Sequence, residues 1–193
     1  SEYTSSGILK IKSIDIQITE KCSLKCKDCS NLMQYYTKPQ DSELNQLFKS
    51  IDNLMSVVDH VNEFRVLGGD PFMNKEMHKV VNKLSKFENN SRIVIYTNAT
   101  ILPKDEQLEC LRNKKVGLEI TNYGAASRQH DALVEIFEKE NIEYSTMLQE
   151  TWQDCGRITP HSQKSEKEII EQFNNCCNSD LITLLHGNLY RCP

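Results

Sequence analysis

The sequence predicts an α/β fold with a parallel sheet, and three observations support it. Segments with the alternating apolar pattern of strands are followed by segments with the apolar spacing of helices, in repeated order along the chain. Helical crossovers between successive strands imply right-handed parallel units. Polar and glycine-containing stretches follow the strands, at the edge where a parallel barrel or open sheet places its active site. The 193 residues are enough for one sizeable domain.

Five strands are expected in the first three quarters of the chain. Ser13–Thr19 alternates apolar with polar residues and is rich in β-branched side chains. The other four are short apolar runs, most of which end in polar or glycine residues. They are Glu63–Leu67, Arg92–Tyr96, Val116–Ile120 and Ile142–Met147.

Helical spacing separates these strands. The clearest helix begins near Leu44, where apolar residues recur every three or four positions, and Asp41 or Ser42 is expected to cap its start. Ser127 is expected to cap a later helix that runs to about residue 140. Further helices are expected at 75–87, 104–112 and 166–173.

The regular alternation stops after the fifth strand. Residues 150–164 include Trp152 and Pro160 and are expected to form a long loop. Leu181–Cys192 has the pattern of a β-hairpin that turns at 186–188. We therefore expect a core over residues 1–148 and a C-terminal unit over residues 149–193.

Composition narrows the class of protein. The 27 acidic and 23 basic side chains leave a net charge of -4, which argues against a protein that coats nucleic acid. No apolar run approaches the ~20 residues of a membrane helix, and the first residues lack a signal-peptide pattern. We expect a cytoplasmic protein that binds neither nucleic acid nor membrane. In that reducing compartment, its eight cysteines point to metal binding or chemistry before disulfides.

Three cysteines follow the first strand directly. Cys22, Cys26 and Cys29 have the spacing C-x3-C-x2-C. Three thiolates on one short loop suit three irons of a cubane cluster, which leaves the fourth iron open to a small molecule. Thiolates also bind zinc, but structural zinc normally takes four ligands, often from two C-x2-C pairs. A non-catalytic zinc-binding scaffold is therefore the weaker alternative.

At this loop the chain resembles the radical S-adenosylmethionine (SAM) superfamily. The resemblance implies a partial (β/α) TIM-type barrel of five or six parallel strands, followed here by the C-terminal hairpin. It implies that Cys22, Cys26 and Cys29 hold a 4Fe-4S cluster whose open iron chelates SAM. A flavodoxin or ferredoxin-type protein then supplies an electron, and SAM is cleaved to a 5′-deoxyadenosyl radical that abstracts hydrogen from the substrate.

Two strand ends extend the resemblance. Gly68-Gly69-Asp70-Pro71 after the second strand resembles a Gly-Gly-Glu-Pro stretch of the family, which implies that Gly68, Gly69 and Asp70 line the methionine end of SAM. Thr97 and Asn98 after the third strand resemble a Thr-Asn-Gly stretch that lies near the ribose. A capped turn is an equally good interpretation of this second stretch, because asparagine favours turns.

The fourth strand supplies further candidates. By resemblance, Asn122, Ser127 and Arg128 meet the ribose and the carboxylate of SAM, since an arginine fits a carboxylate in a two-pronged contact. A solvated helix surface is the competing interpretation of Arg128. The family's pattern is broken at Asp28, where an aromatic residue is frequent, and at Ala99, which replaces the glycine.

The C-terminal cysteines carry a second, shorter resemblance. Cys177, Gly187 and Cys192 have the spacing C-x9-G-x4-C, which resembles the opening of the SPASM and twitch modules. The resemblance implies that Cys177 and Cys192 are ligands of an auxiliary iron–sulfur cluster, and that a longer natural chain continues beyond Pro193. A hairpin with buried thiols is the alternative interpretation.

These observations predict a radical SAM oxidoreductase or tailoring enzyme that acts on a small polar, sugar-like substrate. A peptide-modifying maturase, a glycyl-radical activase and an epimerase stay open as alternatives. The sequence does not identify a catalytic base. Its candidates are Tyr123, Glu119, Asp154 and Arg157, placed only by a strand end or the long loop.

Overall fold

The computed structural model describes residues 2–3, 7–151, 163–176 and 178–191. Their strands form one eight-stranded sheet. Seven of the strands follow the order β6-β5-β4-β3-β2-β7-β8, and the eighth, β1 (Glu2–Tyr3), pairs with β2. Neighbours among β2 to β6 pair in parallel. They span Leu9–Thr19 (β2), His60–Gly68 (β3), Asn90–Thr97 (β4), Val116–Asn122 (β5) and Glu143–Leu148 (β6).

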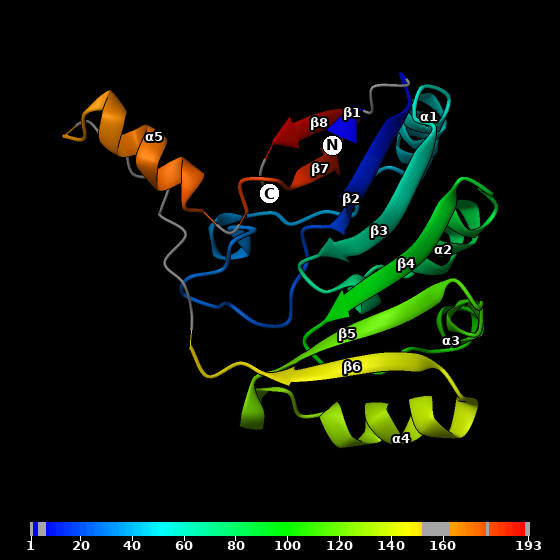
Figure 1. Cartoon of the computed structure of the whole chain (residues 1–193). Coiled ribbons are helices and arrows are strands. Elements are labelled where there is room, and N and C mark those ends of the chain that lie inside the picture. Colours follow the sequence, from blue (N-terminus) through cyan, green and yellow to red (C-terminus); the bar gives the residue numbers. More distant parts are fainter. Residues whose placement is uncertain (1, 4–6, 152–162, 177, 192–193) are drawn as a thin grey trace.

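The helices between these strands lie along one face of the sheet (Figure 1). The helices between β2 and β6 form because their apolar residues recur at helical spacing, and that side of each helix packs on the sheet. The helix that precedes the C-terminal hairpin buries none of its residues. The α-helices span Leu44–Met55 (α1), Met77–Ser85 (α2), Glu106–Leu111 (α3), His130–Glu140 (α4) and Glu166–Asn174 (α5), and short 3-10 helices span Met33–Tyr35, Pro71–Met73 and Gly124–Ala126.

The core lies between this sheet face and the helices. In β2, Ile14, Ile16 and Ile18 are fully buried in it. Because side chains alternate along a strand, Asp15 and Gln17 project to the opposite, concave face. The order of strands and helices confirms the predicted α/β fold with a partial barrel, and the carboxyl ends of β2 to β5 point toward the cysteine loop (Figure 1).

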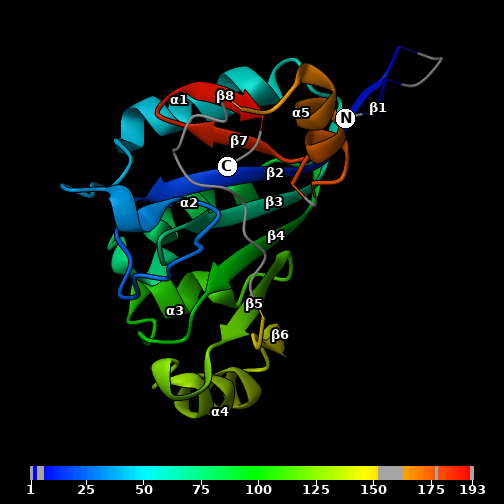
Figure 2. The same ribbon diagram turned by 90° about the vertical axis from the view of Figure 1, so that its left-hand side faces the viewer.

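The predicted C-terminal hairpin is present and extends the same sheet. Its strands are β7 (Ile182–Leu185) and β8 (Asn188–Arg191). β7 pairs in parallel with β2, through the register Asp15↔Thr183, and becomes the sixth parallel strand. Figure 2 shows β7 and β8 beside β2 at one end of the sheet, with β6 and α4 at the other end. The division into a core over 1–148 and a unit over 149–193 stays a prediction.

Two predicted helix caps are wrong. Glu43 caps α1 by accepting hydrogen bonds from backbone N–H groups of the first turn, while Asp41 bonds to the cysteine loop and the Ser42 hydroxyl to the Gln17 carbonyl. α4 begins three residues after Ser127, whose side chain is buried. None of the helices within the described ranges has both the length and the apolar character that crossing a bilayer requires.

Candidate functional site

The cysteine loop joins β2 to α1 and is closed at its neck. The Glu20 N–H donates to the Gln40 carbonyl at 2.8 Å. The Asp41 carboxylate accepts one hydrogen bond from the Thr19 hydroxyl at 2.7 Å and one from the Lys21 ammonium at 2.6 Å. Both ends of the loop are thereby fixed to the end of β2, so the cysteines stand at a defined place above the sheet.

Gly68 and Gly69 let the end of β3 touch the start of this loop. The Gly69 N–H donates to Thr19 O at 3.0 Å, and the Asp70 N–H donates to Lys21 O at 2.9 Å. A Cβ atom on Gly68 would lie 2.2 Å from Thr19 O, and one on Gly69 would lie 2.1 Å from Lys21 O. Both glycines line the cavity described below, and their lack of a side chain is required by the neighbouring backbone.

Asp70 lies behind the cavity wall. It is fully buried. Its Oδ1 accepts a hydrogen bond from Phe72 N at 3.0 Å, and its Oδ2 accepts bonds from the Thr97 hydroxyl and from Asn98 N, both at 2.9 Å. Burial raises the pKa of this carboxyl, and the three hydrogen bonds oppose that rise. Asp70 therefore ties the ends of β3 and β4 together, and its contact with the methionine end of SAM stays a prediction.

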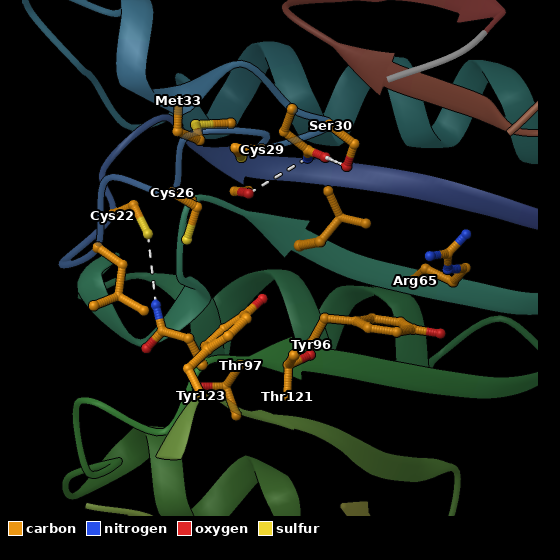
Figure 3. Close-up of a pocket in the computed structure, with 16 residues that line it drawn as sticks. Cys22, Cys26, Cys29, Ser30, Met33, Arg65, Tyr96, Thr97, Thr121 and Tyr123 are labelled. Carbon is orange, nitrogen blue, oxygen red and sulfur yellow. Dashed lines mark hydrogen bonds between the residues drawn. The ribbon is translucent and has the colours of Figure 1, made fainter. Parts of the chain in front are cut away.

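Asn98 connects the end of β4 to the first cysteine. Its Nδ2 lies 3.5 Å from Cys22 Sγ, a contact marked by a dashed line in Figure 3. It also lies 3.4 Å from Ser23 Oγ. Its Oδ1 accepts a hydrogen bond from Thr100 N at 3.0 Å, and the Ser23 and Thr100 hydroxyls also bond to each other. Ala99 adopts a left-handed conformation with φ of 54°, so the backbone keeps the geometry that suits the family's glycine.

The three cysteines share one cavity of about 210 Å³ with the two strand ends. Figure 3 shows their side chains around it. Within the described residues, no three Cys, His, Asp or Glu side chains lie close enough together to hold a metal ion. The lining residues are Cys22, Leu24, Cys26, Cys29, Ser30, Asn31, Met33, Arg65, Leu67, Gly68, Gly69, Tyr96, Thr97, Asn98, Thr121 and Tyr123.

The thiols of this cavity are partly buried. Burial raises the pKa of Cys22 to about 11 and also raises the pKa of Cys26, with smaller contributions from the neighbouring thiols. Without a metal, both groups are therefore protonated at neutral pH. Iron binding would release these protons, because thiolates are the ligand form.

Arg65 lines the cavity and was not predicted. It stands on β3 with its guanidinium carbon 4.7 Å from the centre of the Tyr96 ring. Its Nη1 lies 3.3 Å from Asp15 Oδ1 on the neighbouring strand β2. The sequence contains no separate signal for this pair, because both strands carry other charged residues, such as Lys12 and Glu63.

Asn122 and Arg128 lie outside the cysteine cavity. Together with Ser127 they line a separate depression beside α4, where Arg128 is exposed. The Ser127 hydroxyl donates to Asn98 O at 2.7 Å and accepts from Tyr123 N at 2.8 Å. Ser127 therefore supports the loops that follow β4 and β5. The SAM contacts of Asn122 and Arg128 stay predictions.

Of the candidate catalytic bases that the structure describes, Tyr123 lines the cysteine cavity and Glu119 does not. Burial raises the pKa of the Tyr123 phenol, so it stays a neutral hydroxyl at pH 7. Glu119 instead accepts a hydrogen bond from Ser145 on β6. Several predicted residues lie outside the described residues, namely the loop with Trp152, Cys155 and Pro160, the candidates Asp154 and Arg157, and the cluster candidates Cys177 and Cys192.

The family model of the Radical SAM superfamily matches residues 16–188, and the chain belongs to this superfamily. Its members use a 4Fe-4S cluster and SAM, and two solved structures similar to this chain contain bound AdoMet. The three-cysteine loop and the strand-end motifs all lie within the matched range.

Particular relatives extend this result. A GTP 3′,8-cyclase of Clostridium acetobutylicum is 25% identical over 175 residues, which are 90% of this chain and 52% of that protein. The chain thus spans about half the length of that relative. The structure of BtrN in complex with AdoMet and 2-DOIA superposes with a TM-score of 0.60 at 14% identity, over 94% of this chain and 73% of that one. SuiB of Streptococcus suis, bound to the precursor peptide SuiA, gives 0.58 at 15% identity, over 95% and 43%. These two structural matches support the fold alone.

Proposed function

We propose that Cys22, Cys26 and Cys29 hold the 4Fe-4S cluster of this radical SAM enzyme and that the cavity beside them receives SAM. The observation that carries the proposal is the shared lining: the three thiols face one cavity together with Gly68-Gly69 and Thr97-Asn98. When bound, the two groups supply a 5′-deoxyadenosyl radical that abstracts a hydrogen atom from the substrate. This reaction class agrees with the superfamily.

The chain's own residues position these groups. The bonds at the loop neck hold the cysteines at the carboxyl end of β2. The Asn98 amide faces Cys22 Sγ at 3.5 Å, and such a donor beside a ligand sulfur orients it and tunes the cluster. Gly68 and Gly69 leave the wall free of side chains, so an amino-acid moiety has access to backbone groups.

The substrate in this proposal is small, polar and sugar-like, and the reaction is its oxidation or tailoring. Support comes from the concave face, where Arg65, Tyr96 and Thr121 offer hydrogen-bonding groups beside the cysteines. A second candidate is cyclisation of a nucleotide, favoured by the 25% identity with a GTP 3′,8-cyclase over 90% of this chain. Peptide modification is a third, because the fold resembles that of SuiB with its precursor peptide.

The C-terminal unit, residues 149–193, is proposed to carry an auxiliary cluster through Cys177 and Cys192. The hairpin supports this idea because Ile182 pairs with Arg191, so the segments that flank the two strands leave from the same end. A flavodoxin or ferredoxin-type protein is the proposed source of the electron.

Anaerobic reconstitution tests the cluster assignment. The Cys22→Ala, Cys26→Ala, Cys29→Ala triple variant should lose about four irons per chain relative to the unmodified protein, and should form no 5′-deoxyadenosine from SAM and dithionite. Cys110→Ala is the matched control, because this thiol is buried in α3 and bonds to Gln107 O at 3.1 Å. Unmodified protein that stays colourless and binds zinc, or that forms no 5′-deoxyadenosine, would contradict the proposal.

A further inference from the structure

Asp15 and Arg65 form a buried ion pair on the floor of the concave face. They stand on neighbouring strands in register, and Asp15 Oδ1 lies 3.3 Å from Arg65 Nη1. Asp15 is 1% exposed. The Tyr96 ring packs on the guanidinium from the other side at 4.7 Å. Arg65 is thus held between a carboxylate and an aromatic face. It lines the cysteine cavity, on the side of Tyr96 (Figure 3).

This pair sets the charge of the cavity floor. Among the described residues that line the cavity, Arg65 is the one lysine or arginine. An unpaired arginine in such a place binds phosphate groups through two parallel hydrogen bonds. Burial raises the pKa of Asp15 to about 6, so its carboxylate is still mostly ionised at neutral pH and offsets the charge of Arg65. Glu63, two positions before Arg65 on the same face of β3, also raises this pKa. A phosphorylated ligand would therefore meet no net positive charge there.

Neutral hydrogen-bonding capacity remains beside the pair. Apart from Asp15 Oδ1, which forms the ion pair, three buried atoms on β2, β3 and β7 have no hydrogen-bond partner among the described residues. Buried polar atoms of this kind are normally satisfied, by protein, water or ligand. A second cavity of about 310 Å³ is lined by Gln17 and Thr183, and also by Arg191. Asn31 lines both cavities. The three atoms are Gln17 Nε2, Arg65 Nε and Thr183 Oγ1.

We infer that Asp15 is a specificity-determining residue: by neutralising Arg65 it makes this cavity select an uncharged, hydroxyl-bearing substrate over a phosphorylated one. The polar side chains of Gln17 and Thr183, which line the second cavity, then bind hydroxyl groups of that substrate. The inference rests on the proposed function, in which substrate and SAM share the concave face. It commits the enzyme to an unphosphorylated polyol and against a nucleoside triphosphate.

The Asp15→Asn variant tests this inference, because it removes the negative charge with almost no change of shape. Binding of inorganic triphosphate and of GTP is measured by equilibrium dialysis on the full chain with its cluster reconstituted. The unmodified protein should bind both only weakly. Asp15→Asn should bind both about ten-fold more tightly or better, since a guanidinium–phosphate contact is charge-assisted, and addition of Arg65→Gln should abolish the gain.

Glu138→Gln is the matched control, because it removes the same charge from an exposed position on α4 and should leave triphosphate binding unchanged. Tight GTP binding by the unmodified protein overturns the inference, and so does an Asp15→Asn variant that folds but gains nothing. The same samples are assayed for 5′-deoxyadenosine. If 5′-deoxyadenosine forms but Asp15→Asn binds triphosphate no more tightly than the unmodified protein, only this inference fails. If 5′-deoxyadenosine never forms, the proposed function fails, and the difference in triphosphate binding between the two proteins still tests the role of Asp15.

Discussion

Gly69 and Asp70 show how single residues of the strand-end motif shape the site through backbone contacts. The Gly69 N–H and the Asp70 N–H both bond to carbonyls at the start of the cysteine loop. The Asp70 side chain, in turn, holds the Thr97 hydroxyl and the Asn98 N–H. This turn therefore connects the end of β3, the start of the cysteine loop and the end of β4. A substitution in the turn should displace the cysteines although it replaces none of them.

The Gly69→Ala variant should fold but retain little cluster iron. Its new Cβ would lie 2.1 Å from Lys21 O, a backbone atom that cannot move without displacing Cys22. Gly117→Ala is the matched control, since its Cβ would meet the flexible side chain of Arg92 at 2.9 Å. Iron content per chain and circular dichroism are measured after identical anaerobic reconstitution. Full iron content in Gly69→Ala would contradict this account of the turn.

Among the secondary-structure elements, the hairpin illustrates both the reach and the limit of local patterns. Its turn is predicted by the His186-Gly187-Asn188 sequence, and both His186 and Gly187 have positive φ values, 47° and 83°. Such values are typical of a two-residue hairpin turn. Its parallel pairing with β2 rests on two residue pairs. Because β7 pairs with β2 over such a short stretch, we expect the turn to contribute much of the geometry of the hairpin.

The Gly187→Val variant should lower the free energy of unfolding by about 1–2 kcal/mol, because a β-branched residue is strained at positive φ. The Gly187 Cβ position also approaches Gln46 Nε2 of α1 at 3.0 Å. Leu189→Val on β8 is the control: this side chain is 54% exposed, and surface changes of this kind stay within about 0.5 kcal/mol. Urea denaturation measures both. Equal stability of Gly187→Val and the unmodified chain would show that the turn tolerates another conformation.

At the scale of the whole molecule, what the sequence predicts correctly is what depends on nearby residues. Strand order and the cysteine loop follow from periodicity and spacing over a few positions. The contacts of Asp70 with Thr97 and Asn98 join residues 27 and 28 positions apart, and no local pattern contains them. The Asp15–Arg65 pair has the same limitation, because a charged residue in a strand gives the same pattern whether it faces solvent or a cavity.

The surface of the cysteine loop suggests how an electron carrier reaches the molecule. The chain carries a net charge of -4, yet Lys25 and Lys27 are exposed on the loop itself, next to Cys26. Local positive charge in an acidic protein steers an acidic partner to that place and raises its association rate. We therefore expect a flavodoxin or ferredoxin-type donor, if acidic, to dock over these two lysines.

The Lys25→Glu, Lys27→Glu double variant should form 5′-deoxyadenosine about ten-fold more slowly with an acidic flavodoxin at low salt, and at nearly the unmodified rate with excess dithionite. The difference should shrink at high ionic strength, because salt screens exposed charges. Lys114→Glu, Lys139→Glu is the control pair, since both lysines are exposed and lie away from the loop. An equal loss in the control pair would mean that overall charge governs the encounter, whereas an equal loss with dithionite would mean that the loop variant had damaged the cluster. Only a loss confined to the loop pair and to the protein donor identifies this surface as the docking site.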